Sequence, residues 1–305
     1  MNMTQFDIHM VKPQGYCGGV LKAIDSAILT RKKNPNKTIT ILGNLVHNQF
    51  VKKALSYYKI GTVDNKNKTR LELLDEIQEG IVIFTAHGIG KEVYQKAMEK
   101  GLEIVDASCP FVLTTQKIVH SKLEDGFVVF YIGKNKHPEA EAIYLNEKNV
   151  YLIEHIEDIP KNIKEKIFVT NQTTMSILDI KEIFDEIKRI YPDALIHDEI
   201  CNATRVRQQA ILNLKNQGFN TLIVVGDPTS NNTKQLAMIG KKADIPQIIK
   251  VESVEDIHLD SLKDASKIAI TSGASTPTYL TNQIYEYLMN QKDKPEIKVN
   301  EILNG

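Results

Sequence analysis

The sequence predicts an α/β protein of three similar α/β units with mainly parallel sheets, arranged as a pseudo-threefold trefoil around a central cavity. The spacing of the three cysteines, which are all that the 305-residue chain contains, is the first observation behind this prediction. Cys109 follows Cys17 by 92 residues, and Cys201 follows Cys109 by 92 residues (109 − 17 and 201 − 109). Equal gaps of this size are typical of an internal repeat.

The order of the segments after each cysteine is the second observation. A helical pattern comes first, and a β-rich run that ends at a glycine follows it. A second apolar run then ends at a threonine. The runs that end at a glycine are 38–43, 127–133 and 221–226, and those that end at a threonine are 81–85, 167–170 and 268–271. Strands that alternate with helices predict parallel sheets covered on both faces.

Polar residues follow both kinds of strand at matching places. Four positions past the three glycines stand His47, His137 and Ser230. Past the three threonines stand His87, Gln172-Thr173-Thr174 and Ser275. Because parallel sheets bind ligands beyond the carboxyl ends of their strands, we expect these residues to line the cavity.

The repeat also predicts the domain boundaries. We expect units over residues 18–108, 109–198 and 199–290, followed by a polar C-terminal tail over 291–305. The segment 1–17 contains a strand pattern with no earlier repeat to complete, so we expect it to complete the third unit. A polar segment at 64–68 interrupts the first unit, and polar segments at 154–158 and 253–256 occupy matching places in the other two.

The balance of charges limits the classes of partner. The chain has 38 Lys and Arg residues and 38 Asp and Glu residues, so its net charge is zero. This argues against electrostatic binding of nucleic acid or of an anionic membrane over a broad surface. An anionic ligand must therefore be held by local donors. With no apolar run that reads as a signal peptide or a membrane span, we expect a cytoplasmic protein. Reducing conditions there favour metal-binding or catalytic cysteines over disulfides.

The three cysteines are candidate metal ligands. Each stands between a predicted strand and the start of a helix, where helix-terminal amides favour the thiolate. Three converging thiolates suit zinc with an open fourth position, and they equally suit three irons of an iron–sulfur cluster. The remaining alternative is that they are small buried apolar residues. Their register disfavours this, because packing constrains size and shape and does not require the same residue in each repeat.

Over about residues 11–277, the chain resembles the LytB family of 4-hydroxy-3-methylbut-2-enyl diphosphate reductases. Short motifs in the family's order carry the resemblance. They are Gly15-Tyr16-Cys17-Gly18-Gly19-Val20, Val46-His47-Asn48, Ala86-His87-Gly88, Ser108-Cys109-Pro110, His137-Pro138-Glu139, Gln172-Thr173-Thr174, Ile200-Cys201-Asn202-Ala203-Thr204, Ser230-Asn231-Asn232 and Gly273-Ala274-Ser275.

The resemblance implies one [4Fe-4S] cluster on Cys17, Cys109 and Cys201, with an open fourth iron. It further implies the last step of the non-mevalonate isoprenoid pathway. In that step the allylic hydroxyl of a small diphosphate substrate is removed reductively, which yields isopentenyl and dimethylallyl diphosphate. No flavin or nicotinamide site is recognisable, so we expect the electrons to come from outside. The resemblance implies a ferredoxin or flavodoxin as the electron donor.

The resemblance also assigns roles to individual residues. Hydroxide is a poor leaving group, so its departure needs a Lewis acid and a nearby proton donor. Glu139 is the expected donor, Thr173 relays a proton to it, and His137 lies near the reacting end. The expected substrate-binding residues are His47, His87, His137, Thr173, Ser230, Asn231, Asn232 and Ser275, with Asn231 where the family often has serine.

Other polar residues are expected to have ordinary surface or core roles. These are His9, His120, His155, His197 and His258, together with the expected surface charges Arg205 and Arg207. The alternative for the two arginines is contact with an acidic electron donor. Two rival functions use the same cysteines. A zinc-dependent hydrolase needs no electron donor, and an iron–sulfur sensor needs no set of acid, hydroxyl and phosphate donors.

Overall fold

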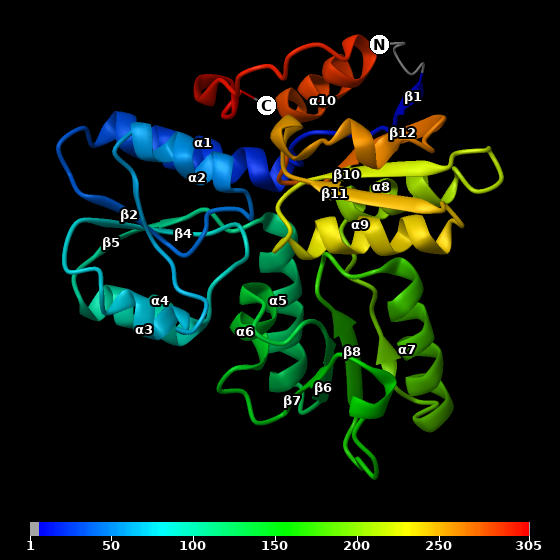
Figure 1. The fold of residues 1–305 in the computed structure, drawn as a ribbon. Helices are drawn as coiled ribbons and strands as arrows, with labels where there is room; N and C mark the ends of the chain where they lie inside the picture. Colours follow the sequence, from blue (N-terminus) through cyan, green and yellow to red (C-terminus); the bar gives the residue numbers. More distant parts are fainter. Residues whose placement is uncertain (1–5, 305) are drawn as a thin grey trace. The chain divides into compact units, whose positions relative to one another are not determined.

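The computed structural model describes residues 6–304, and in this part of the chain it contains three four-stranded parallel sheets (Figure 1). The first comprises β2 (Ile39–Leu42), β3 (Gly61–Val63), β4 (Ile81–Phe84) and β5 (Glu103–Asp106). The second comprises β6 (Val128–Ile132), β7 (Val150–Ile153), β8 (Ile167–Asn171) and β9 (Leu195–Ile196). The third comprises β10 (Thr221–Val225), β11 (Gln247–Val251), β12 (Lys267–Ser272) and β1 (Asp7–Met10).

The strand order is the same in all three sheets. It runs β3-β2-β4-β5, β7-β6-β8-β9 and β11-β10-β12-β1. The N-terminal strand β1 pairs in parallel with β12, with Ile8 opposite Ile268, so it completes the third sheet as predicted. The predicted fold class of three similar parallel α/β units is therefore confirmed.

The helices that connect the strands are mostly α-helices. They are α1 (Gly18–Lys33), α2 (Gln49–Tyr57), α3 (Arg70–Leu74), α4 (Lys91–Glu99), α5 (Pro110–Glu124), α6 (Pro138–Tyr144), α7 (Ile177–Ile190), α8 (Asn202–Leu212), α9 (Asn231–Lys242) and α10 (Thr278–Asn290). Four 3₁₀ helices complete the described elements: η1 (Ile156–Asp158), η2 (Val254–Asp256), η3 (Leu259–Leu262) and η4 (Val299–Glu301). Every helix within residues 6–304 is too short or too polar to cross a lipid bilayer.

The chain divides into two compact units, which we call the terminal unit and the central unit. The terminal unit comprises the described residues up to 21, residues 47–54 and the described residues from 202 onward. The central unit comprises residues 22–46 and 55–201. The boundaries expected from the repeat stay a prediction. Residues 1–5 and 305, which the predicted first segment and tail include, lie outside the described part.

The strands of the second sheet are apolar along their whole length because helices cover both faces of the sheet. Strand side chains alternate between the two faces, so a strand covered on both sides buries every residue. Val128, Phe130 and Ile132 pack on one face, against α7. Val129 and Tyr131 pack on the other face, against α5 and α6.

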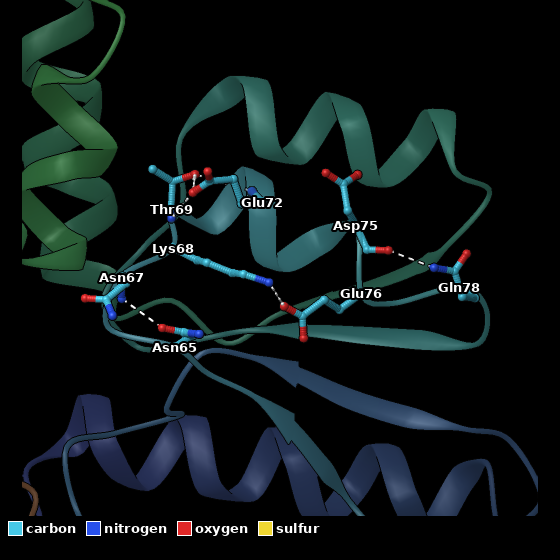
Figure 2. A network of polar contacts seen from close by, with 8 residues as sticks. All are labelled: Asn65, Asn67, Lys68, Thr69, Glu72, Asp75, Glu76 and Gln78. Atoms are coloured by element: carbon cyan, nitrogen blue, oxygen red, sulfur yellow. Dashed lines mark hydrogen bonds and ion pairs between the residues drawn. The ribbon is translucent and has the colours of Figure 1, made fainter.

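The first sheet is covered on one face by α3 and α4, whose apolar residues cluster with Leu42, Val82 and Phe84. The polar segment 64–68 leads into α3, which the sequence did not reveal. Figure 2 shows the polar contacts around this turn. Asn65 Oδ1 accepts from the Asn67 amide at 2.9 Å, and Lys68 pairs with Glu76 at 2.6 Å.

A capping box begins α3. The Thr69 side chain accepts from the Glu72 amide, and the Glu72 carboxylate accepts in turn from the Thr69 amide (Figure 2). This satisfies two amide donors that the start of a helix otherwise leaves open. Capping boxes also begin η1 and η2, at the two matching polar segments that the repeat predicted.

The polar tail after α10 packs back onto the terminal unit. The Tyr279 hydroxyl accepts from the Lys298 amide at 2.9 Å, and the Tyr16 hydroxyl donates to the Ile302 carbonyl at 2.7 Å. Ile302 is fully buried. The last residues of the described chain are therefore held against the loop that carries Cys17.

Two glycines in the first repeat, Gly80 before β4 and Gly101 before β5, allow a matched test of how tightly the turn before β4 is packed. Both have positive φ, +88° at Gly80 and +70° at Gly101. A Cβ at Gly80 would overlap the Thr38 carbonyl oxygen, whereas a Cβ at Gly101 would meet no atom within 4 Å. We expect Gly101→Ala to lower the free energy of unfolding by about 1–2 kcal/mol, the cost of the left-handed conformation alone.

Gly80→Ala should lower the free energy of unfolding at least twice as much, because the Thr38 carbonyl also accepts from the Ile81 amide at 2.9 Å and is not free to move. Urea unfolding of the two variants beside the unsubstituted chain measures the difference. Equal losses would show that the turn relaxes around the added methyl group.

Candidate active site

The three cysteines occupy one backbone setting that occurs three times. Each lies between an edge strand (β1, β5 or β9) and a helix (α1, α5 or α8) that begins at the next residue. Each cysteine amide donates to a carbonyl two residues past the end of the neighbouring strand. The pairs are Cys17 with Ala274 at 3.0 Å, Cys109 with Ala86 at 3.0 Å and Cys201 with Thr173 at 3.1 Å. The repeat therefore holds the backbone at each cysteine in the same way.

The thiols are reduced and partly exposed. Cys109 is the N-cap residue of α5, with Pro110 at the first helical position. Cys17 belongs to the terminal unit, and Cys109 and Cys201 belong to the central unit. Within residues 6–304, no three His, Cys, Asp or Glu side chains form a group that could hold a metal ion. The convergence of the three thiolates stays a prediction.

The central unit brings together the acid, the hydroxyl and the histidine expected near the reacting end. Glu139 lies in the first turn of α6 and is only 2% exposed. Its Oε1 accepts from the Thr173 amide at 2.7 Å, and its Oε2 accepts from the Thr173 hydroxyl at 3.0 Å. His137 is the N-cap residue of α6, and its Nδ1 accepts from the Glu139 amide at 3.2 Å. The cap of one short helix and the end of β8 thus orient all three residues.

Burial raises the pKa of the Glu139 carboxyl from 4.5 to about 7, because removal from water disfavours the charged form. The two hydrogen bonds from Thr173 act in the opposite direction and do not cancel the effect of burial. A carboxyl group with this pKa is partly protonated near neutral pH. It therefore suits general acid catalysis.

His87 lies beside this group, in the loop after β4. Its ring packs edge to face on the ring of His137, with centroids 5.7 Å apart and an interplanar angle of 85°. Its Nδ1 lies 3.3 Å from the Thr85 hydroxyl. The central unit therefore gathers His87, His137, Glu139 and Thr173.

The terminal unit contains the remaining expected substrate-binding residues. Ser230 is the N-cap residue of α9, and its Oγ accepts from the Thr233 amide at 3.4 Å. Asn231 and Asn232 are the first two residues of α9 and are buried. Ser275 donates through Oγ to the His47 carbonyl at 2.9 Å. The start of α9 thus combines helix-terminal amides with side-chain donors, the arrangement that binds phosphate groups.

The side-chain amide of Asn232 is buried without hydrogen-bond partners among the described residues, which lowers the stability of the fold. Both polar atoms of its side-chain amide are inaccessible and have no hydrogen-bond partner among the described residues. A buried polar group without a partner costs about 1–3 kcal/mol. A ligand that supplied partners would remove this cost, so Asn232 stays a candidate binding residue.

One expectation was wrong. Arg207, expected to be a surface charge, is 3% exposed and donates through Nη2 to the Gly15 carbonyl at 2.7 Å. The buried residues of α8 are Thr204, Arg207, Gln208 and Ile211. This is the spacing of a buried helix face, but three of its four positions are polar, so a search for apolar periodicity misses it. Arg205 is exposed, as expected.

The raised pKa of Glu139 predicts how stability depends on pH. The folded chain keeps a proton on Glu139 that the unfolded chain releases between pH 4.5 and about 7, so stability falls as pH rises through this window. A shift of this size corresponds to about 3 kcal/mol. Glu139→Gln removes this part of the dependence.

Urea unfolding at pH about 5 and at pH about 8 should measure this change. As pH rises between these values, the free energy of unfolding of Glu139→Gln should increase by about 3 kcal/mol relative to that of the unsubstituted chain. Glu147→Gln, at an exposed position just after α6, is the control and should show no such gain. A difference between Glu139→Gln and the unsubstituted chain that is independent of pH would contradict the raised pKa.

Comparisons with known proteins show which family the chain belongs to. The model of the family described as LytB protein matches residues 8–289. A 4-hydroxy-3-methylbut-2-enyl diphosphate reductase of Geobacillus kaustophilus is 41% identical, with 92% of this chain and 90% of the relative covered. A protein of the same description from Anoxybacillus flavithermus is 43% identical over the same shares.

Solved structures show the same fold. The E-1-hydroxy-2-methyl-but-2-enyl-4-diphosphate reductase of Plasmodium falciparum superposes with a TM-score of 0.85 at 27% identity, covering 98% of this chain and 97% of that one. A second structure, described as the terminal enzyme of the non-mevalonate pathway, gives 0.62 at 27% identity, covering 94% and 100%. Because the family model and the relatives match nearly the full length, the chain belongs to the LytB protein family.

Proposed function

We propose that the chain is a 4-hydroxy-3-methylbut-2-enyl diphosphate reductase that yields isopentenyl and dimethylallyl diphosphate. Besides family membership, one observation carries the proposal. The buried Glu139 carboxyl is held by both donors of Thr173 and has a pKa of about 7. Loss of an allylic hydroxyl requires such a proton donor, because water leaves far more readily than hydroxide.

The proposal includes one [4Fe-4S] cluster held by Cys17, Cys109 and Cys201. The chemistry of the donors suits this cofactor, because three free thiols occupy the same backbone setting at three helix starts. Cys17, Cys109 and Cys201 would hold the cluster, which would supply electrons and Lewis acidity when bound. The electrons come from an external protein donor such as ferredoxin or flavodoxin, and a reducing cytoplasm keeps the thiols available.

Proton transfer is the task of the residues in the central unit. The reaction replaces a C–O bond with a C–H bond and consumes two electrons and two protons, with water as the second product. Protonated Glu139 gives one proton to the departing hydroxyl oxygen. Thr173 orients the carboxyl group through its amide and passes a proton to Oε2 through its hydroxyl. The second proton goes to a carbon of the allylic product.

The diphosphate is held by donors that do not require a net positive chain. In the terminal unit these are the start of α9, with Ser230, Asn231 and Asn232, together with Ser275 and His47. In the central unit His87 and His137 present imidazole groups next to Glu139. Asn231, where the family often has serine, donates through its amide instead of a hydroxyl.

Anaerobic purification tests the proposal directly. We expect the full chain to contain iron and acid-labile sulfide, and to convert the hydroxylated diphosphate when a chemical reductant is added. Each Cys→Ala variant should lose cluster occupancy. Zinc without sulfide in the unsubstituted protein would reject the reductase in favour of a hydrolase.

Glu139→Gln separates proton transfer from the other steps in the same assay. The variant should keep its iron and sulfide and bind the substrate, but its kcat should fall at least ~100-fold, the usual contribution of a positioned general acid. Glu147→Gln is the matched control and should keep the full rate. A normal kcat in Glu139→Gln would remove Glu139 from the mechanism.

Replacement of Asn232 by a residue of similar size should separate stability from binding. Asn232→Leu removes a buried amide that has no partner among the described residues, so we expect the free energy of unfolding to stay the same or rise. The KM for the diphosphate should increase about 10-fold or more, because a ligand contact is lost. Urea unfolding and steady-state kinetics measure the two effects. An unchanged KM would show that Asn232 does not contact the substrate.

A further inference from the structure

The loop that carries Cys17 is held through both backbone polar groups of Gly15, its amide and its carbonyl. The Gly15 amide donates to the Ser272 hydroxyl at 3.2 Å, and its carbonyl accepts from Arg207 Nη2 at 2.7 Å. Gly15 has φ of +78°, and a Cβ there would overlap the Thr278 hydroxyl. The backbone two residues before Cys17 is therefore confined by β12, by α8 and by the start of α10.

Arg207 holds this loop from an unusual position for a charged side chain. It is 3% exposed, and its Nη1 also donates to the Ala203 carbonyl at 3.0 Å, so its guanidinium joins α8 to Gly15. Burial of a charge is costly unless its donors are used in hydrogen bonds. Arg205, the other arginine of α8, is exposed.

The other two cysteines show a related contact. Arg207 stands six residues after Cys201 and contacts the residue two before Cys17. Thr115 stands six residues after Cys109, and its hydroxyl lies 3.3 Å from the carboxylate of Glu199, two residues before Cys201.

In the first repeat the corresponding contact is made one residue closer to each of the two cysteines that it lies between. Lys22 stands five residues after Cys17 and donates to the carbonyl of Ser108, one residue before Cys109, at 3.4 Å. In each case the helix after one cysteine holds the loop before the next. The contact of Arg207 is the shortest of the three. Its charged donor, like that of Lys22, makes the hydrogen bond stronger than one between neutral groups.

We propose that Arg207 is a positioning residue for Cys17. It fixes the loop 15–17 to α8, the helix that begins directly after Cys201, and so sets how rigidly the Cys17 thiol is presented. The role of that thiol as a cluster ligand rests on the proposed function, whereas the anchoring of the loop does not.

Residue-resolved thiol labelling tests the proposal on the anaerobically purified full chain. Iodoacetamide is added, and the alkylation of Cys17, Cys109 and Cys201 is followed by peptide mass spectrometry. In Arg207→Met, we expect the labelling rate of Cys17 relative to Cys109 to rise about 10-fold or more, as the loss of a hydrogen bond from a charged donor implies. Arg205→Met is the matched control and should leave the ratio unchanged.

Arg207→Lys provides a second variant if Arg207→Met does not fold. Lysine keeps the charge but lacks the planar fork that reaches two carbonyls, so its ratio should lie between those of the unsubstituted chain and Arg207→Met. An unchanged ratio in the variants that fold would overturn the proposal. An equal rise at all three cysteines would overturn it as well, because Arg207 would then support the whole fold.

Iron release to a chelator separates this inference from the proposed function. If the protein holds a cluster, Arg207→Met should release iron faster by a factor similar to the change in labelling, and Arg205→Met should not. If the unsubstituted chain holds neither iron nor sulfide, the proposed function fails. The ratio of Cys17 to Cys109 labelling still decides the role of Arg207 in that case.

Discussion

The hydrogen bond from each cysteine amide to a carbonyl past the neighbouring strand is the constraint on which the rest of the site depends. A parallel sheet brings the carboxyl ends of its strands to one edge, where the loops must turn back into helices. At that edge the first residues of each helix have amides without intrahelical partners. The bond from the cysteine amide fixes the loop just before this point. Each thiol therefore lies directly before a helix start.

Much of the fold was predictable because its strands are buried on both faces. Such strands are continuous apolar runs, and the even spacing of the cysteines aligned these runs into three copies. The same comparison predicted that β1 completes the third sheet, since that copy otherwise lacked its last strand. The helix α3 could not be predicted in this way, because it has only five residues and follows a polar segment.

The sequence predicts which residues are candidates for the site, and their roles stay a prediction, but it does not predict the protonation or burial of those residues. The His137-Pro138-Glu139 motif identified Glu139, but its pKa depends on burial and on the two donors of Thr173, which lies 34 residues away in sequence. Arg207 was missed for a related reason. Its burial depends on a partner, the Gly15 carbonyl, that lies 192 residues away. Sequence patterns reveal buried helix faces that are apolar. The burial of a polar face can be understood only from the groups that it contacts in the fold.

The repeat also explains how a nearly symmetric scaffold supports an asymmetric reaction. Six residues past the glycine that ends the first strand of each copy stand Gln49, Glu139 and Asn232. The carbonyls that accept from the cysteine amides belong to Ala86, Thr173 and Ala274. An acid and a hydroxyl thus occur together in the second copy, where they form the Glu139–Thr173 pair, while the other two copies place an amide and an alanine there. In the proposed mechanism, divergence at these two positions of the repeat therefore places proton transfer in the second copy.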